Sequence, residues 1–152
     1  MKKEVWGPIT WKALHCLTIK IKDEYFLYQK DELINIIISM MSNLPCPNCT
    51  AHALGLIKKY NLKRINDKQL LIRALFMIHN DVNKRLKKSL FKYESVEPTY
   101  SIINLKESLE VYYDISVNQK YGEKMMIYNF HRKAFLKNFR NYIQKNIIYF
   151  NE

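Results

Sequence analysis

Apolar residues recur along this chain at the spacing of α-helices. The clearest series follows Asp67, a residue type that often caps the start of a helix. Its members stand three or four residues apart: Leu71, Leu75, Ile78, Val82 and Leu86. This spacing puts them on one helix face, and nowhere does the chain sustain the alternation of a half-buried strand. The pattern therefore predicts an all-α fold.

A four-helix bundle with a short fifth helix is the most economical prediction. The predicted helices cover Pro8 to Ile21, Glu32 to about Asn43, Cys46 to roughly Tyr60, a fourth opened by Asp67, and Ser95 to Tyr112. Pro8 suits the first turn of the first helix, and Asp31 is the expected cap of the second. The second helix is apolar on almost every side, which is typical of a bundle centre or a subunit interface.

Residues 115–152 differ in character from the preceding 114 and are predicted to be a basic, aromatic-rich helical extension of a domain that covers residues 1–114. Phe135, Phe139, Ile143 and Ile147 repeat at intervals of four, between lysine and arginine residues. Such a helix packs on the bundle, binds a partner, or lies on nucleic acid or a membrane surface. Packing on the bundle or on a dimer is favoured, and we expect no catalytic part for the extension.

Composition narrows the class of protein. The 152 residues include 25 Lys and Arg against 14 Asp and Glu, a net charge of +11 that favours nucleic acid, an anionic surface or a phosphate-bearing cofactor as partner. Three cysteines exclude a disulfide framework but leave room for one reactive pair. No apolar run approaches the roughly 20 residues of a membrane span. We expect no signal peptide, no transmembrane segment and a cytoplasmic location.

Cys46-Pro47-Asn48-Cys49 is the sharpest motif in the chain. Two cysteines at this spacing can close a disulfide, and the positive end of a helix stabilises a thiolate there, which favours thiol–disulfide exchange. Zinc binding would need further ligands such as His52 and Cys16. A c-type haem would need histidine where Thr50 stands, and a thioredoxin fold would need a preceding strand. Redox chemistry on a helical scaffold is therefore favoured.

Two further pairs combine polar and aromatic side chains at helical spacing. His79 and Asn83 lie one turn apart on the face that also carries apolar residues, and Trp11 and His15 are related in the same way. A polar pair on such a face needs a ligand or a hydrogen-bond partner. The alternatives are a satisfied core histidine for the first pair and ordinary core packing for the second.

Together these segments resemble the FAD-linked sulfhydryl oxidases of the Erv/Alr family. The matching patterns are W-G-P-x-x-W-x-x-L-H at Trp6–His15, C-x-x-C at Cys46–Cys49 and H-N-x-V-N-x-x-L-x-K at His79–Lys88. The resemblance covers roughly residues 5–100. The surroundings of the C-x-x-C motif look especially like the short forms encoded by large DNA viruses.

The resemblance implies a thiol oxidase that holds FAD in a four-helix bundle, usually as a homodimer packed through the first two helices. A substrate dithiol would attack the Cys46–Cys49 disulfide at Cys46. Cys49 would face the flavin, and electrons would pass through FAD to dioxygen, giving hydrogen peroxide. The family's second, shuttle C-x-x-C is missing, because only Cys16 lies outside the pair. We therefore expect direct exchange with protein dithiols or with a small redox carrier protein.

The resemblance also implies a set of flavin contacts. The candidate cofactor-binding residues are Gly7, Thr10, Trp11, His15, His52, His79, Asn80, Val82, Asn83, Lys84, Lys87, Lys88 and Tyr100. Among them Lys84, Lys87 and Lys88 are the candidates for the pyrophosphate, and Tyr100 for stacking on the adenine. No metal is expected, nucleic acid becomes an unlikely partner, and a viral member would act in the host cytoplasm or the virion. The rivals are a flavin-free thiol–disulfide exchange module and a basic helical binding protein.

Overall fold

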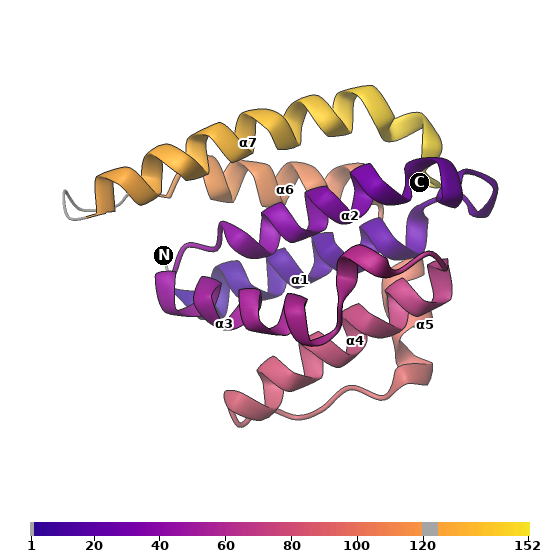
Figure 1. Cartoon of the computed structure of the whole chain (residues 1–152), viewed down its shortest axis with the longest axis horizontal. Helices are drawn as coiled ribbons and strands as arrows, with labels where there is room; N and C mark the ends of the chain where they lie inside the picture. The colour runs from indigo at the N-terminus through magenta and orange to yellow at the C-terminus, as the bar shows by residue number, and fades with distance from the viewer. Residues whose placement is uncertain (1, 120–124) are drawn as a thin grey trace.

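The computed structural model describes residues 2–119 and 125–152, and these residues form helices without a β-strand (Figure 1). The helices are α1 (Lys3–Lys20), α2 (Phe26–Ser42), α3 (Pro47–Lys59), α4 (Lys68–Arg85), α5 (Val96–Ser101), α6 (Leu105–Val117) and α7 (Met126–Asn146). Short 3₁₀ turns lie at Asp23–Tyr25, Leu62–Arg64, Tyr93–Ser95 and Ile147–Tyr149. The predicted all-α fold is confirmed.

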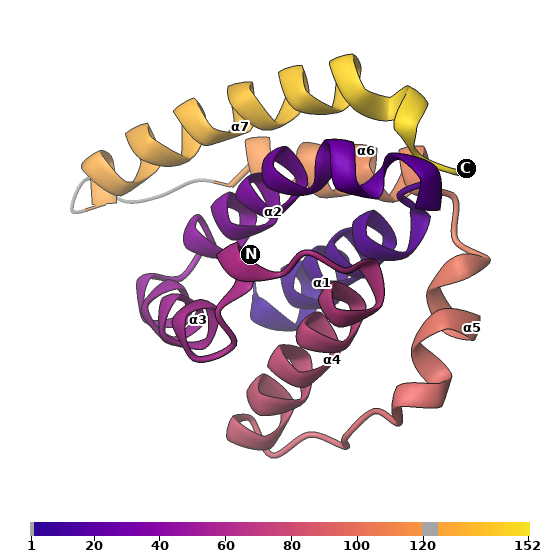
Figure 2. The same cartoon turned by 45° about the vertical axis from the view of Figure 1, so that its right-hand side comes forward.

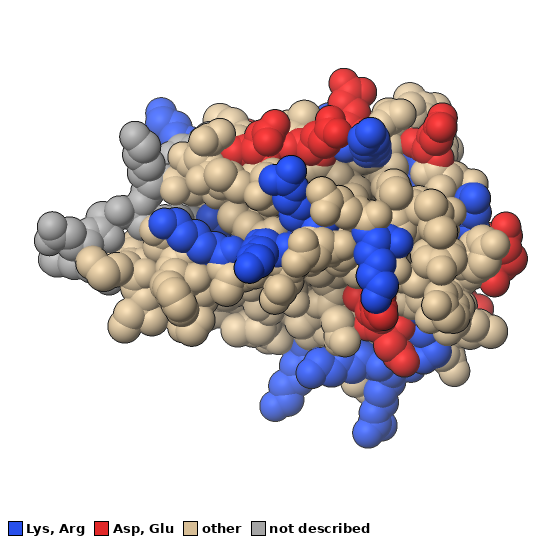
Figure 3. All heavy atoms as spheres, turned by 90° about the horizontal axis from the view of Figure 1, so that it is seen from above, with Lys and Arg blue, Asp and Glu red and all other residues tan. Residues whose placement is uncertain are grey.

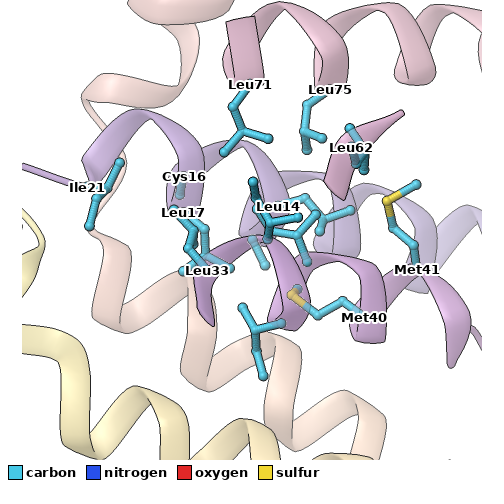
Figure 4. Packing of buried hydrophobic residues seen from close by; sticks show 14 of the residues in the cluster. Leu14, Cys16, Leu17, Ile21, Leu33, Met40, Met41, Leu62, Leu71 and Leu75 are labelled. Atoms are coloured by element: carbon cyan, nitrogen blue, oxygen red, sulfur yellow. The ribbon is translucent and has the colours of Figure 1, made fainter. Parts of the chain in front are cut away.

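Helix α1 is the centre of the molecule. It packs against α4 and α5 and, on its other side, against α6, while α2 packs against α3 and α7. Both views show α6 and α7 on one side of α1 and α2, with α4 on the opposite side (Figures 1 and 2). The core between these helices is formed by Leu14 and Leu17 of α1, Leu33 and Met40 of α2, and Leu71 and Leu75 of α4 (Figure 4).

Side-chain caps fix the starts of the two helices that carry the C-x-x-C motif and the His79 pair. The Asp67 side chain accepts a hydrogen bond from the backbone N–H of Leu70 at 3.0 Å, so the predicted start of α4 is confirmed. At α3 the cap is Cys46, and Pro47 occupies the first helical position, where its missing N–H costs nothing.

Two predicted helix starts are wrong. Helix α1 begins at Lys3, five residues before Pro8, which leaves only the exposed carbonyl of Glu4 without its intrahelical donor. Helix α2 begins at Phe26, so Asp31 lies inside it on the exposed face and caps nothing. Its first turn carries Phe26, Leu27 and Tyr28, but no side-chain cap marks its start. Gln29, a polar residue of this turn, is buried, and its amide donates to Asn146 of α7 at 3.1 Å.

The predicted fifth element is two helices. Helix α5 ends at Ser101, and α6 begins at Leu105. The side chain of Asn104 caps α6 by accepting a hydrogen bond from the N–H of Glu107 at 2.9 Å. An asparagine N-cap marks the start of the second helix, and apolar periodicity alone does not reveal such a restart. The proposed division between residues 114 and 115 falls inside α6, and α6 and α7 share one core with α1 and α2.

The predicted packing of the C-terminal segment on the bundle is confirmed. Helix α7 buries Phe135, Leu136 and Phe139, while Lys133 and Lys137 face solvent. Seen from the side of α7, lysine and arginine side chains are spread among neutral ones, and acidic side chains lie along the upper edge, at the right and below the centre (Figure 3). Residues 120–124 of the predicted extension lie outside the described residues.

The enclosure of α1 bears on assembly. Every residue of the stretch from Ala13 to Ile21 is buried within the chain, with α6 covering the side that α4 and α5 leave open.

In the described part of the chain, no helix combines the length and apolar character that a membrane crossing requires.

Candidate active site

Cys46 and Cys49 form a disulfide at the start of α3, with their Cα atoms 5.2 Å apart. The Cys46 sulfur accepts a hydrogen bond from the backbone N–H of Cys49 at 3.2 Å. Pro47 and Asn48 between them are exposed, and both cysteines are half-buried. A helix N-terminus and a directed N–H group stabilise negative charge on Cys46, and the sulfur is within reach of an incoming thiol.

Behind the disulfide lies a cavity of about 780 Å³. Its wall is assembled from α1, α3, α4, α5 and the segment that joins α4 to α5, and both cysteines belong to it. The predicted cofactor residues on the wall are Gly7, Thr10, Trp11, His52, His79, Val82, Asn83, Lys88 and Tyr100. A cavity of this size is within the range that holds organic cofactors.

Aromatic rings from three helices meet at one side of the cavity. The Trp11 and His79 rings stack with centroids 4.0 Å apart and planes 8° from parallel. The His15 ring stacks on that of Tyr100 at 4.4 Å. His15 Nε2 and His79 Nδ1 share a hydrogen bond of 2.9 Å, so His79 of α4 is held by both Trp11 and His15 of α1. His15 itself lies behind the wall.

Burial keeps this histidine pair neutral. It lowers the pKa of His15 to about 3, with a further contribution from His79. Burial and then the charge of Lys88 lower the pKa of His79 to about 4. At neutral pH both rings are therefore uncharged, and the buried His15 Nδ1 has no hydrogen-bond partner among the described residues.

This pair should make the protein sensitive to acid. The unfolded chain protonates each histidine near pH 6.5, whereas the folded chain does so only near pH 4 or 3, so stability present above pH 6.5 is lost as the pH falls. At about 1.4 kcal/mol per pH unit, the expected loss at pH 5 is about 2 kcal/mol per histidine. Urea unfolding at pH 7.5 and 5.0 measures it.

The matched control for the acid effect is His131, which is exposed on α7. His131→Asn should keep the full loss of stability between pH 7.5 and 5.0, and His15→Gln should reduce it. An unchanged loss in His15→Gln would show that other groups cause the acid sensitivity.

Positive side chains on the cavity wall differ partly from those predicted. The wall includes Lys3, Lys12, Arg85 and Lys88. Lys84 and Lys87 are exposed and not part of it; Lys87 has a left-handed backbone (φ 58°) just past the end of α4. Arg85 could have been found from helix geometry, because it lies one turn from Val82.

Two other predicted residues have specific structural surroundings. Asn80 does not line the cavity: its side-chain amide donates to the carbonyl of Phe91 and accepts from the N–H of Phe91, at 3.0 and 2.9 Å. It thereby fixes the segment after α4, which places Phe91 itself on the wall. His52 does line the cavity; burial and then Arg85 lower its pKa, and its buried Nε2 has no hydrogen-bond partner in the part of the chain that the structure describes.

The third cysteine lies apart from the redox pair. Cys16 is fully buried, its Sγ donates to the carbonyl of Tyr100 at 3.8 Å, and burial raises the pKa of its thiol. Residues 2–119 and 125–152 contain no group of three His, Cys, Asp or Glu side chains placed to hold a metal ion. The zinc alternative for Cys16 and His52 therefore has no structural support.

Comparison with known proteins assigns the family. The family model described as the Erv1/Alr family matches residues 8–101. This chain belongs to that family. The match runs from within α1 to the end of α5, includes both motif histidines and the C-x-x-C pair, and ends before α6. No solved structure matches the chain.

The relatives of this Erv1/Alr protein that are described next are all named FAD-linked sulfhydryl oxidases. It is 34% identical over 95 residues to the "FAD-linked sulfhydryl oxidase" of African swine fever virus (isolate Pig/Kenya/KEN-50/1950), covering 62% of this chain and 79% of the relative. The protein of the same name from isolate Tick/Malawi/Lil 20-1/1983 is 34% identical over 101 residues, 65% and 84% of the two chains. "FAD-linked sulfhydryl oxidase ERV2" of Saccharomyces cerevisiae is 30% identical over 100 residues, 66% and 50%.

Proposed function

We propose that this protein is an FAD-dependent sulfhydryl oxidase that converts dithiols of protein substrates into disulfides. The observation that carries the proposal is the position of the Cys46–Cys49 disulfide on the wall of the cavity lined by aromatic rings. The names of the Erv1/Alr relatives point to the same activity.

The residues of the cavity fit FAD. The stacked rings of Trp11 and His79 give a flat apolar surface for a planar ring system, and Tyr100 gives a second one. The Nε2 of His52, which has no partner among residues 2–119 and 125–152, and the side chain of Asn83 offer polar contacts inside the wall. Gly7 and Thr10 line the cavity on the α1 side.

The cofactor's two phosphates need positive partners. Lys88 keeps its proposed role in binding them, and we add Lys3, Lys12 and Arg85, which stand on the same wall. We no longer assign Lys84 and Lys87 to the phosphates, because both face solvent outside the cavity.

The protein's own part of the reaction is thiol–disulfide exchange. A substrate thiolate attacks the Cys46 sulfur, forms a bond to it and displaces Cys49 as a thiolate. A second substrate thiolate then attacks the substrate sulfur of this mixed disulfide, releasing the oxidised substrate and leaving Cys46 as a thiolate too. The N–H of Cys49 and the N-terminus of α3 stabilise the charge on Cys46, which makes it a good leaving group.

When bound, FAD supplies the two-electron chemistry, taking electrons from the reduced cysteine pair and delivering them to dioxygen, which becomes hydrogen peroxide. The histidine pair stays neutral, so it places no positive charge beneath the ring surface at physiological pH.

Oxygen uptake tests this function. Purified protein given dithiothreitol should consume dioxygen and produce an equal amount of peroxide, and reduced protein dithiols should serve as well. A flavin-free exchange module would exchange thiols without consuming oxygen, and a basic binding protein would do neither.

With Cys16 buried, the described structure supplies no second redox pair, so substrate or a small redox carrier protein would meet Cys46 directly.

Assembly of this chain should differ from the dimer that the resemblance implies. A second copy packed through α1 would have to displace α6, because Ala13–Ile21 are buried within the chain. We therefore expect a monomer of about 18.3 kDa plus cofactor. Light scattering after size exclusion at micromolar concentration measures the mass; a dimer mass would mean that this face opens or that another face associates.

A cytoplasmic or virion location, with nucleic acid an unlikely partner, stays a prediction.

A further inference from the structure

The segment that leads into the redox motif is held by α7, the last helix of the chain. Tyr128 Oη hydrogen-bonds to the carbonyl of Leu44, two residues before Cys46. It also lies 2.8 Å from Oγ1 of Thr50, the residue after Cys49. One turn further along α7, Arg132 Nε donates to the carbonyl of Asn43 at 2.6 Å. These contacts join residues more than 75 positions apart in sequence.

The donors and acceptors around Tyr128 form a closed ring. Leu44 N–H donates to Thr50 Oγ1 at 3.2 Å. The Leu44 carbonyl can only accept, so the single Tyr128 hydroxyl proton is directed to it, and Thr50 must then donate to Tyr128 Oη. Three hydrogen bonds therefore run in one direction around Leu44, Thr50 and Tyr128. Bonds linked in this way polarise and strengthen one another.

Arg132 holds the same segment through the carbonyl of Asn43. It is 2% exposed, although it carries a full positive charge. Its guanidinium donates to the carbonyl of Asn43 at the end of α2 and, at 3.4 Å, to that of Ser116 near the end of α6. The ends of both helices carry partial negative charge, which compensates the buried cation. Arg132 thus links the ends of α2 and α6 to α7, and the α2 end that it holds, Asn43, lies three residues before Cys46.

We propose that Tyr128 is a positioning residue for the Cys46–Cys49 disulfide, with Arg132 anchoring the same segment. The ring fastens the chain on both sides of the motif, Leu44 before it and Thr50 after it, so it limits how far the two sulfurs separate when the disulfide opens. Held together, two thiols have a high effective concentration and favour the disulfide. The proposal rests on the proposed redox role of this pair, and it assigns to the C-terminal segment a part in the reaction that its sequence did not indicate.

The exchange equilibrium with glutathione tests this directly. Two glutathione molecules reduce the protein disulfide and leave one glutathione disulfide and the protein dithiol. Tyr128→Phe removes the hydroxyl from the ring and should shift this equilibrium about tenfold toward the dithiol, which is about 30 mV for a two-electron couple. Alkylation of the free thiols followed by mass spectrometry of the full chain gives the ratio.

Tyr142→Phe is the matched control. Tyr142 lies on the same helix, and its hydroxyl donates to Gln29 Oε1 at 3.4 Å, far along α7 from Tyr128. Its loss should leave the glutathione equilibrium unchanged. Equal shifts in the two variants, or no shift in Tyr128→Phe, would overturn the proposal and reduce Tyr128 to a packing residue.

A second variant breaks the same ring from the other side. Thr50→Val should shift the equilibrium as Tyr128→Phe does, and the double variant should shift it no further, because each single change already opens the ring. Additive shifts would contradict a closed ring. Both equilibria are measured without dioxygen, so oxidase turnover does not contribute to them. The positioning role can therefore stand where the oxidase function fails, and the oxidase function can stand where the positioning role fails.

Discussion

Cys49→Ser should reduce dithiol-driven oxygen uptake to the background rate while the protein still binds FAD. Serine cannot form the disulfide that the substrate thiolate attacks, so no electrons enter the protein at Cys46. Loss of a group on which every turnover depends lowers kcat by about a thousandfold or more. FAD binding should persist, since Cys49 is one of many residues on the cavity wall. An oxygen electrode and the visible spectrum of the same sample measure both.

Cys16→Ala is the control for this result. Cys16 is buried against Tyr100 and is not part of the cavity wall, so its removal should cost stability but not turnover. Normal oxygen uptake in Cys49→Ser would refute the assigned path, and so would loss of turnover in Cys16→Ala with the fold intact.

Ending the chain after Val117 should unfold the bundle. The cut removes four apolar side chains of the core, Phe135, Leu136, Phe139 and Phe150. Burial of each contributes about 1.5–3 kcal/mol, so their sum of roughly 6–12 kcal/mol is comparable to the whole stability of a small domain. The cut also leaves the carbonyls of Asn43 and Ser116 without Arg132. Far-UV circular dichroism and soluble yield report the outcome.

A pair of point variants on α7 gives the same test more finely. Phe139, 1% exposed, packs edge-on against Tyr112 at 5.2 Å, and Phe139→Ala should cost about 3–5 kcal/mol in urea unfolding. Phe130 on the same helix is 70% exposed, and Phe130→Ala should change stability by less than about 0.5 kcal/mol. A chain ended after Val117 that stays soluble and unfolds cooperatively at the wild-type urea concentration would show that residues 1–117 form a separable domain.

Much of the site could be predicted because it depends on local spacing. Trp11, His79 and Asn83 lie on helix faces that three- and four-residue intervals identify, and all three line the cavity. Lys84 lies outside the cavity wall for a geometric reason: it stands two residues past Val82, and each step along a helix turns the side chain by about 100°. Arg85, one turn beyond Val82, is on the wall instead.

What the sequence could not predict depends on contacts between distant segments. Nothing in the pattern around Tyr128 or Arg132 indicates that they reach Leu44 and Asn43, 84 and 89 residues away. From the sequence alone, the polar residue Gln29 is expected on the surface; its burial depends on its hydrogen bond to Asn146 of α7. Periodicity predicted that α7 has an apolar face, but not that this face holds the segment before Cys46.

The visible spectrum of the anaerobic protein tests the central claim most directly. The account predicts a yellow protein with about one FAD per chain, whose flavin absorbance is bleached by dithiothreitol and returns on admission of air, whereas in Cys49→Ser the absorbance is not bleached on the time scale of turnover. A protein that binds no flavin, or a flavin reduced equally fast in wild type and Cys49→Ser, would contradict it.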